Sequence, residues 1–131
     1  MIATQNRKVE FKDLGLMDYQ VAFDFQQSLM DEIIAKKIHN RDRTDGLHDS
    51  TPNYFLLTEH PHVYTLGKTG QLETLLANED KLREIDATFV KTNRGGDITY
   101  HGFGQMIGYP VMDLDNFSSD IFVYMRNLEE V

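Results

Sequence analysis

Two hydrophobic periods alternate along these 131 residues, and their interleaving constrains the fold more than any other feature. Apolar residues at every second position predict strands, and apolar spacings of three and four predict amphipathic helices. We expect strands at residues 8–15, 54–58, 63–66, 88–92 and 105–114, with further strand after Gly96, and helices at residues 18–38, 78–84 and 118–131. This order predicts an α+β fold, a mixed sheet with helices packed around it.

Three features depart from a regular alternation of strands and helices. Residues 40–53 are polar, contain Gly46 and Pro52 and have no apolar period, so we expect a surface loop there. Pro110 cannot donate a ladder hydrogen bond, which favours an edge strand or a bulge at its position. The last helical pattern has no capping Gly or Asn and no proline after it, which predicts a chain cut inside or just after a helix.

Composition excludes several classes of function. The chain has no cysteine, so it has no disulfide, no thiolate metal site and no cysteine nucleophile. A net charge of −8 disfavours nucleic-acid binding, and it repels an acidic protein partner unless a local basic patch faces that partner. We expect no membrane span and no signal peptide, because no apolar run is long enough, and therefore a cytoplasmic location.

The strongest candidate site is the stretch RGGDITYHGFGQ, Arg94–Gln105. Its paired glycines allow the backbone to approach a ligand closely, and Arg94 can neutralise an acidic group. Thr99 and His101 share one face of a strand, because alternate residues do so. These residues are suited to line a pocket. The alternative is a glycine-rich hairpin with a surface arginine and an incidental histidine.

A metal site is another possible use of the histidines. His60, His62 and His101 would have to be brought together by the fold, with a carboxylate such as Glu59 or Asp97. The sequence has neither a helical H-x-x-x-H spacing nor an HExxH motif to support this. We therefore expect no metal, and histidines that hydrogen-bond to the backbone or line an organic pocket.

Two long motifs in order resemble a known family. TEHPHVYTLGKTG, Thr58–Gly70, and RGGDITYHGFGQMIGYPVMDL, Arg94–Leu114, are similar to the octanoyltransferases of lipoate biosynthesis, the LipB family. A looser similarity extends to DYQVAFDFQQSLM on the first predicted helix. The resemblance covers most of the chain except residues 40–53.

The resemblance implies a fold and a reaction. The fold is that of the biotin and lipoate protein ligases, and the chain would be the N-terminal part of a single catalytic domain, residues 1–131. The reaction transfers an octanoyl group from octanoyl-acyl carrier protein to a lysine of lipoyl domains, those of 2-oxoacid dehydrogenase complexes and the glycine cleavage H protein. It uses a cysteine thioester, which a nearby lysine assists, and no cofactor.

In the family, that cysteine and that lysine lie downstream of these motifs, so we expect no catalytic residue in this chain and no activity from it alone. The resemblance instead implies an acyl-substrate wall made by Arg94, Gly95, Gly96, Asp97, Ile98, Thr99, Tyr100 and His101. His60 and Tyr19 are implied as further pocket wall. Phe103 stands where the family usually has proline, which implies a less rigid turn.

Two other functions remain open from the sequence. One is an ATP-dependent lipoate or biotin ligase of the same fold, in which the glycines would serve a nucleotide. The other is a non-catalytic acyl-binding or interaction module of 131 residues. The residues of the two motifs match the octanoyltransferases better than they match the ligases.

Overall fold

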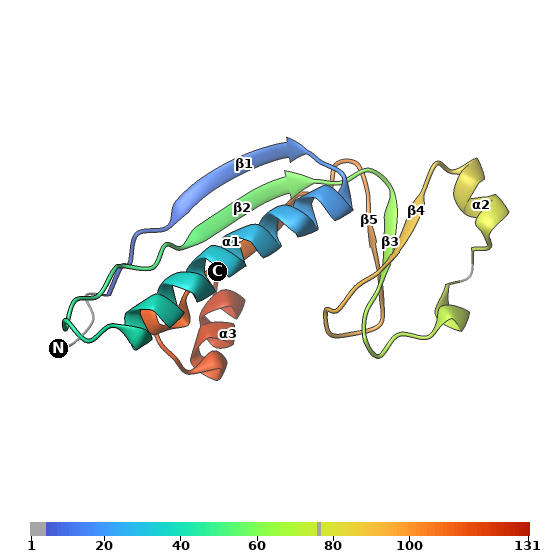
Figure 1. Ribbon diagram of the computed structural model, residues 1–131. Coiled ribbons are helices and arrows are strands. Elements are labelled where there is room, and N and C mark those ends of the chain that lie inside the picture. Colours follow the sequence, from blue (N-terminus) through green and yellow to red (C-terminus); the bar gives the residue numbers. More distant parts are fainter. Residues whose placement is uncertain (1–4, 76) are drawn as a thin grey trace. The chain divides into compact units, whose positions relative to one another are not determined.

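A computed structural model describes residues 5–75 and 77–131 of the chain (Figure 1). Its strands are β1 (Glu10–Leu16), β2 (Tyr54–Glu59), β3 (Val63–Leu66), β4 (Thr88–Lys91), β5 (Ile98–His101) and β6 (Ile107–Val111). Its helices are α1 (Tyr19–Asp42), α2 (Glu79–Glu84) and α3 (Ile121–Glu129), with 3-10 turns at Leu72–Thr74 and Leu114–Asn116. This mixture of helices with mixed sheets confirms the predicted α+β class. Among the described residues, no helix has both the length and the apolar character needed to cross a membrane.

The chain divides into two compact units. Of the described residues, unit 1 contains those up to Lys12, Phe25–Leu56 and Gly108–Val131. Unit 2 contains Asp13–Asp24 and Leu57–Ile107. The strands form two three-stranded sheets, in the orders β1-β2-β6 and β4-β3-β5.

Helix α1 begins where the sequence predicts. Asp18 caps it, because its Oδ1 accepts hydrogen bonds from the backbone N–H groups of Gln20 (2.9 Å) and Val21 (3.2 Å). The helix continues to Asp42, four residues beyond the predicted end, so it takes in the first residues of the predicted loop. The rest of that loop, residues 43–53, has no regular structure.

The core of unit 1 lies between α1 and its strands. Leu29 and Ile33 of α1 are buried, as are Leu56 of β2 and Val111 of β6. Tyr54 of β2 reaches the helix directly, since its hydroxyl donates to Glu32 at 3.1 Å. Of the two positions predicted for Pro110, an edge or a bulge, the structure has the edge, because β6 is an outer strand of its sheet among the described residues.

Strand β6 is shorter than the predicted run of residues 105–114. The residues after it turn sharply, because the carboxylate of Asp113 accepts a hydrogen bond from the backbone N–H of Asp115 at 3.1 Å and caps the 3-10 turn. A carboxylate that caps a turn offers the backbone an alternative to strand hydrogen bonds. The apolar pattern of residues 105–114 does not show where this happens, so the predicted strand was too long.

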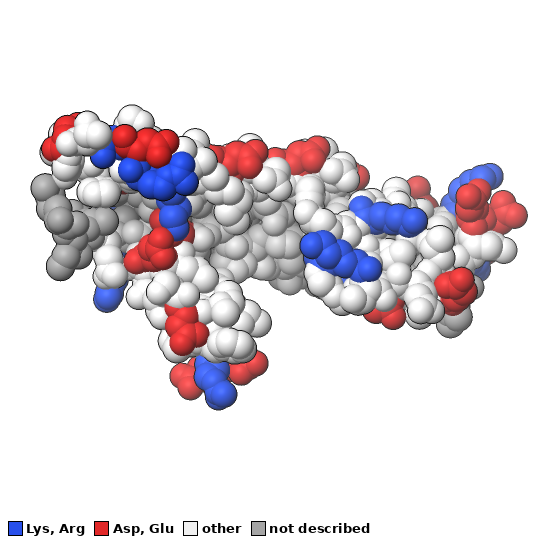
Figure 2. All heavy atoms as spheres, turned by 60° about the horizontal axis from the view of Figure 1, so that its bottom comes forward, with Lys and Arg blue, Asp and Glu red and all other residues white. Residues whose placement is uncertain are grey.

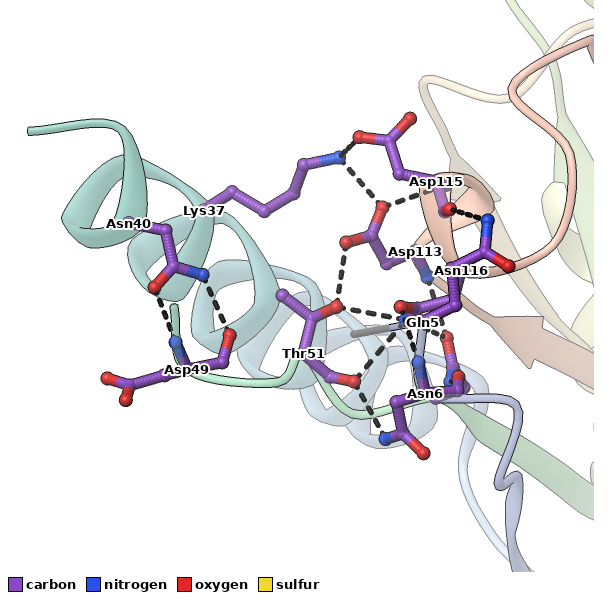
Figure 3. Close-up of polar contacts among 10 residues, drawn as sticks. Gln5, Asn6, Lys37, Asn40, Asp49, Thr51, Asp113, Asp115 and Asn116 are labelled. Carbon is purple, nitrogen blue, oxygen red and sulfur yellow. Dashed lines mark hydrogen bonds and ion pairs between the residues drawn. The ribbon is translucent and has the colours of Figure 1, made fainter. Parts of the chain in front are cut away.

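A polar network, buried in part, joins the three chain segments of unit 1 (Figure 3). The side chain of Asn53 donates to the backbone carbonyl of Asn6 at 2.7 Å. Asn116 donates to the hydroxyl of Thr51 at 2.9 Å, and that hydroxyl donates to Asp113 at 2.8 Å. The network therefore holds three segments that are distant in sequence: the start of the chain, the approach to β2 and the turn after β6.

The small sheet of unit 2 places its central strand between two partners of opposite direction. Strand β3 pairs in parallel with β4, with Val63 opposite Thr88, and antiparallel with β5, with Val63 opposite His101. Helix α2 connects β3 to β4 and buries Leu82. This sheet carries the strand and loop that the sequence identifies as the candidate site.

Candidate functional site

Arg94 fixes the conformation of the loop between β4 and β5. Its Nη2 donates to the carbonyl of Thr65 (2.7 Å) and to the carbonyl of Asp97 (2.9 Å), and its Nη1 donates to the carbonyl of Gly95 (2.8 Å). Its Nε donates to the hydroxyl of Thr65 at 3.2 Å. A guanidinium has five N–H donors, and most of these are used on the loop and on β3. In this structure Arg94 orders the loop, and a contact with substrate stays a prediction.

Gly67 and Gly96 bring two backbones into close approach. The N–H of Gly67 donates to the carbonyl of Asp97 at 2.8 Å, and that of Lys68 donates to the carbonyl of Arg94 at 2.9 Å. A Cβ on Gly67 would collide with the carbonyl of Gly96 and would lie 2.9 Å from that of Gly95. Gly96 has a φ of +85°, in the left-handed region that favours glycine.

Sequence reasoning singles out the pair at 95–96 and misses Gly67. A Cβ on Gly95 would meet nothing within 4 Å, so nothing in the described residues requires glycine there. The signal for Gly67 was present in TLGKTG, where a glycine directly follows a strand. Its importance depends on which loop the fold places opposite it, and a local pattern does not contain that information.

Three aromatic rings from different parts of the chain meet in unit 2. The ring of His60 lies 5.3 Å from that of Tyr19 and 5.6 Å from that of His101, measured between centroids. Tyr19 and His101 are stacked, with centroids 6.0 Å apart. The fold therefore joins the three predicted wall residues that are most distant in sequence.

The two histidines of this cluster have defined hydrogen bonds. His60 is fully buried, and its Nδ1 lies 2.7 Å from the carbonyl of Met17, so Nδ1 donates. Burial lowers the pKa of His60, and nearby His101 lowers it further, although the Met17 carbonyl acts in the opposite direction. Nδ1 of His101 lies 2.8 Å from Oε1 of Gln105.

The remaining residues of β5 border a different hollow. Its volume is about 560 Å³, and its lining includes Tyr64, Leu75, Ile85, Ile98, Thr99 and Tyr100. Beside it, Tyr100 hydrogen-bonds to Nδ1 of His62, and the ring of Phe103 packs edge-on against His62 at 4.9 Å. The predicted segment thus contributes His101 to the aromatic cluster and residues 98–100 to this mostly apolar hollow.

The arrangement supplies a glycine-lined backbone, a neutral buried imidazole and a second imidazole oriented by an amide. These groups can border a pocket, and His101, which is only half-buried, can hydrogen-bond to a carbonyl or accept a proton. Within residues 5–75 and 77–131, no group of three or more His, Cys, Asp or Glu side chains is placed to hold a metal ion.

Unit 1 has a hollow of about 590 Å³ beside the polar network of Figure 3. Lys37 borders it and forms ion pairs of 2.7 Å with both Asp113 and Asp115. Burial by itself would raise the pKa of Asp113, but hydrogen bonds from Lys37 and Thr51 outweigh it and lower that pKa. No buried side-chain N or O atom of the described residues lacks a hydrogen-bond partner, so this cluster stabilises unit 1.

Comparison with known proteins adds the following. Residues 18–131 match the model of the lipoyl protein ligase A/B catalytic domain. Over 125 residues, 95% of this chain, the sequence is 54% identical to an octanoyltransferase of Christiangramia forsetii and 53% identical to one of Flavobacterium psychrophilum, with 53% of each relative covered. An octanoyltransferase of Cytophaga hutchinsonii is 50% identical, with 51% of its length covered. The chain spans about half the length of these curated relatives.

Proposed function

The chain belongs to the family of lipoyl protein ligase A/B catalytic domains, and on that premise we propose that it contributes the acyl-binding part of an octanoyltransferase of lipoate biosynthesis. The observation that carries this proposal is identity of about one residue in two with octanoyltransferases over 95% of the chain. The meeting of Tyr19, His60 and His101 supports it, because these are the residues that the family motifs assign to the pocket wall.

The proposed reaction has two steps. A cysteine thiolate attacks the thioester carbonyl of octanoyl-acyl carrier protein, the carrier thiol leaves and takes up a proton, and the octanoyl group becomes a cysteine thioester. The ε-amine of a lysine in a lipoyl domain then attacks this thioester, an amide forms and the cysteine thiol is released. A second lysine near the cysteine lowers its pKa and transfers protons.

The 131 residues contain no cysteine, so this chain supplies no such nucleophile. We place the cysteine and its lysine in the half of the relatives that this chain does not match. Within the chain, residues 94–101 form the acyl wall, Gly96 gives the loop its turn, and Tyr19 and His60 support the ring of His101. The proposed partners are octanoyl-acyl carrier protein, which donates the acyl group, and lipoyl domains, which accept it.

Gln105 sets the role of His101 in this proposal. An amide oxygen only accepts, so the N–H of His101 is on Nδ1 when Gln105 is oriented as in this structure. Nε2 of the neutral ring then accepts a hydrogen bond. Donation from Nε2 to a thioester carbonyl requires the imidazolium form or a rotated Gln105 amide.

A chimera tests the proposed function. The 125 matched residues replace their counterparts in the Christiangramia forsetii octanoyltransferase, and mass spectrometry follows octanoylation of a lipoyl domain by octanoyl-acyl carrier protein. We expect transfer by the chimera, a loss of at least about tenfold for His101→Ala, and no transfer by the 131-residue chain alone. A folded chimera that does not transfer would contradict the proposal, as would transfer by the isolated chain.

An ATP-dependent ligase is the second candidate, because the matching family model covers both lipoyl protein ligase types. The same chimera distinguishes the two functions by its acyl donor. Octanoylation from free octanoate and ATP, with none from octanoyl-acyl carrier protein, would favour the ligase. The reverse pattern favours the transferase.

A further inference from the structure

The turn that follows β5 decides how the ring of His101 is oriented. It carries Gln105, whose Oε1 lies 2.8 Å from Nδ1 of His101. The N–H of Gln105 donates to the carbonyl of Gly102 at 3.2 Å and closes the turn. Gly104, its third residue, has a φ of +80°, as in a type II turn. A change in this turn therefore moves the amide that His101 contacts.

The turn has little stiffness of its own. Proline is common at the second position of such turns because its ring fixes φ, but here Phe103 stands between Gly102 and Gly104. Phe103 is 57% exposed, so burial does not hold it. The N–H of Gly104 donates to the carboxylate of Glu59 at 3.4 Å, which is long for a hydrogen bond.

Ion pairs do not hold the turn either. Among the described residues, every ion pair of a Lys or Arg in unit 2 lies within α2. Figure 2 shows both signs of charge together at that end of the unit. Order in the turn therefore has to come from ring packing and hydrogen bonds.

His62, the residue before β3, supplies such a contact. Its ring packs edge-on against that of Phe103, with centroids 4.9 Å apart, in a geometry that aromatic pairs prefer. It also lies close to the start of the turn, since a Cβ on Gly102 would be 3.0 Å from Nδ1 of His62 and would collide with the hydroxyl of Tyr100. His62 therefore borders the two residues with which the turn begins.

His62 is itself fixed by the small sheet. Its carbonyl accepts a hydrogen bond from the N–H of Thr88, the first residue of β4, at 2.9 Å. Its Nδ1 hydrogen-bonds to the hydroxyl of Tyr100 on β5, and the two rings are stacked with centroids 5.9 Å apart. Tyr100 in turn lies opposite Tyr64 of β3, with ring centroids 5.0 Å apart. The ring of His62 thus connects the turn to three paired strands.

We propose that His62 is a positioning residue, which holds the turn of residues 102–105 and thereby fixes the Gln105 amide against the ring of His101. The inference rests on the proposed function, in which His101 belongs to the acyl wall, and adds to it a residue outside that wall. The hydrogen bond at Nδ1 of His101 decides which ring nitrogen carries the proton. His62 therefore controls whether Nε2 of His101 accepts or donates a hydrogen bond at the acyl group.

The position of the proton on His101 tests this directly. Nitrogen NMR of the 131-residue chain with isotope-labelled histidine distinguishes Nδ1–H from Nε2–H at about pH 8, where an ordinary imidazole is neutral. His101→Gln identifies the signals of His101. We expect Nδ1–H in the unaltered chain and a shift toward Nε2–H in His62→Ala, because the released amide no longer selects one form. His48→Ala, at an exposed histidine of unit 1, is the control and should cause no shift.

A second substitution separates positioning from a contribution to stability alone. Phe103→Pro fixes φ at the second position of the turn without help from His62. His62→Ala/Phe103→Pro should therefore restore Nδ1–H on His101, although it restores none of the contacts of His62. A residue that only stabilises the fold would show no such rescue.

Three results would overturn the proposal: Nε2–H in the unaltered chain, an unchanged proton position in folded His62→Ala, or no rescue by Phe103→Pro. His62→Gln keeps a hydrogen-bonding group for Tyr100 but has no ring to pack against Phe103. We expect it to shift the proton in the same direction, and it replaces His62→Ala if that variant does not fold.

Transfer by the chimera separates this inference from the proposed function. His62→Ala should lower kcat about fivefold, and it should cause no further loss in the His101→Ala background because both act through one ring. If the chimera does not transfer while the proton shift and its rescue are observed, the positioning role stands and the proposed function fails. If the chimera transfers and His62→Ala changes neither kcat nor the proton position, the proposed function stands and the positioning role fails.

Discussion

At the scale of single residues, the candidate site depends on close backbone approach more than on charge. Arg94 uses its donors on carbonyls of its own loop and of β3. Gly67 lets that loop approach the end of β3, since any side chain there would meet the carbonyl of Gly96. The shape of the loop is therefore set by contacts with its own backbone and with the end of β3.

Two alanine substitutions test this view. Gly67→Ala should lower the free energy of unfolding by about 1–3 kcal/mol, because a methyl group placed against backbone carbonyls forces the loop to shift. Gly95→Ala should change it by no more than about 0.5 kcal/mol, since its Cβ meets open space. Urea unfolding measures both. Equal effects would show that the approach of Gly67 to residues 95–96 does not hold the loop.

At the scale of elements, one carboxylate holds unit 1 together. Asp113 is buried, caps the turn after β6, and accepts hydrogen bonds from Lys37 at 2.7 Å and Thr51 at 2.8 Å. These hydrogen bonds link α1, the segment before β2 and the end of β6. Because they need the ionised form of Asp113, the association of these elements depends on pH.

The sign of that dependence follows from the direction of the pKa. The pKa of Asp113 is lower in the folded chain than its ordinary value of 3.8, so its stabilisation is full above that value and is lost as the pH falls below it. Asp113→Asn should cost about 1–3 kcal/mol at pH 7 and reduce the acid dependence of the unfolding free energy.

Glu129→Gln, an exposed change on α3, is the control for Asp113→Asn and should leave both quantities nearly unchanged. Urea unfolding between pH 3 and pH 7 compares the three proteins. An unaltered acid slope in Asp113→Asn would show that the network contributes nothing through ionisation.

At the scale of the whole molecule, apolar surface remains uncovered on the described part of the chain. None of the residues of α3 is buried, and its exposed side chains include Ile121, Phe122 (77% exposed) and Met125. Contiguous apolar surface of this kind favours association. We expect the 131-residue chain to bind a hydrophobic dye or to self-associate, and Phe122→Ser to reduce either effect.

Fluorescence of the dye and sedimentation measure this prediction together. Val9→Ser on unit 1, also at an exposed apolar residue but outside α3, is the comparison. We expect it to have a smaller effect than Phe122→Ser. A monomer that melts cooperatively and binds no dye would contradict the expectation that this surface drives association.

The sequence by itself determined the order of strands and helices and the cap at Asp18, and it limited Pro110 to an edge or a bulge. Each of these follows from local periodicity or from the chemistry of one residue. Only the tertiary structure decided that Gly67 opposes Gly96, that Tyr19, His60 and His101 meet, and that Arg94 is used within its own loop. These features join residues far apart in the chain, and a local pattern does not specify which distant residues the fold brings together.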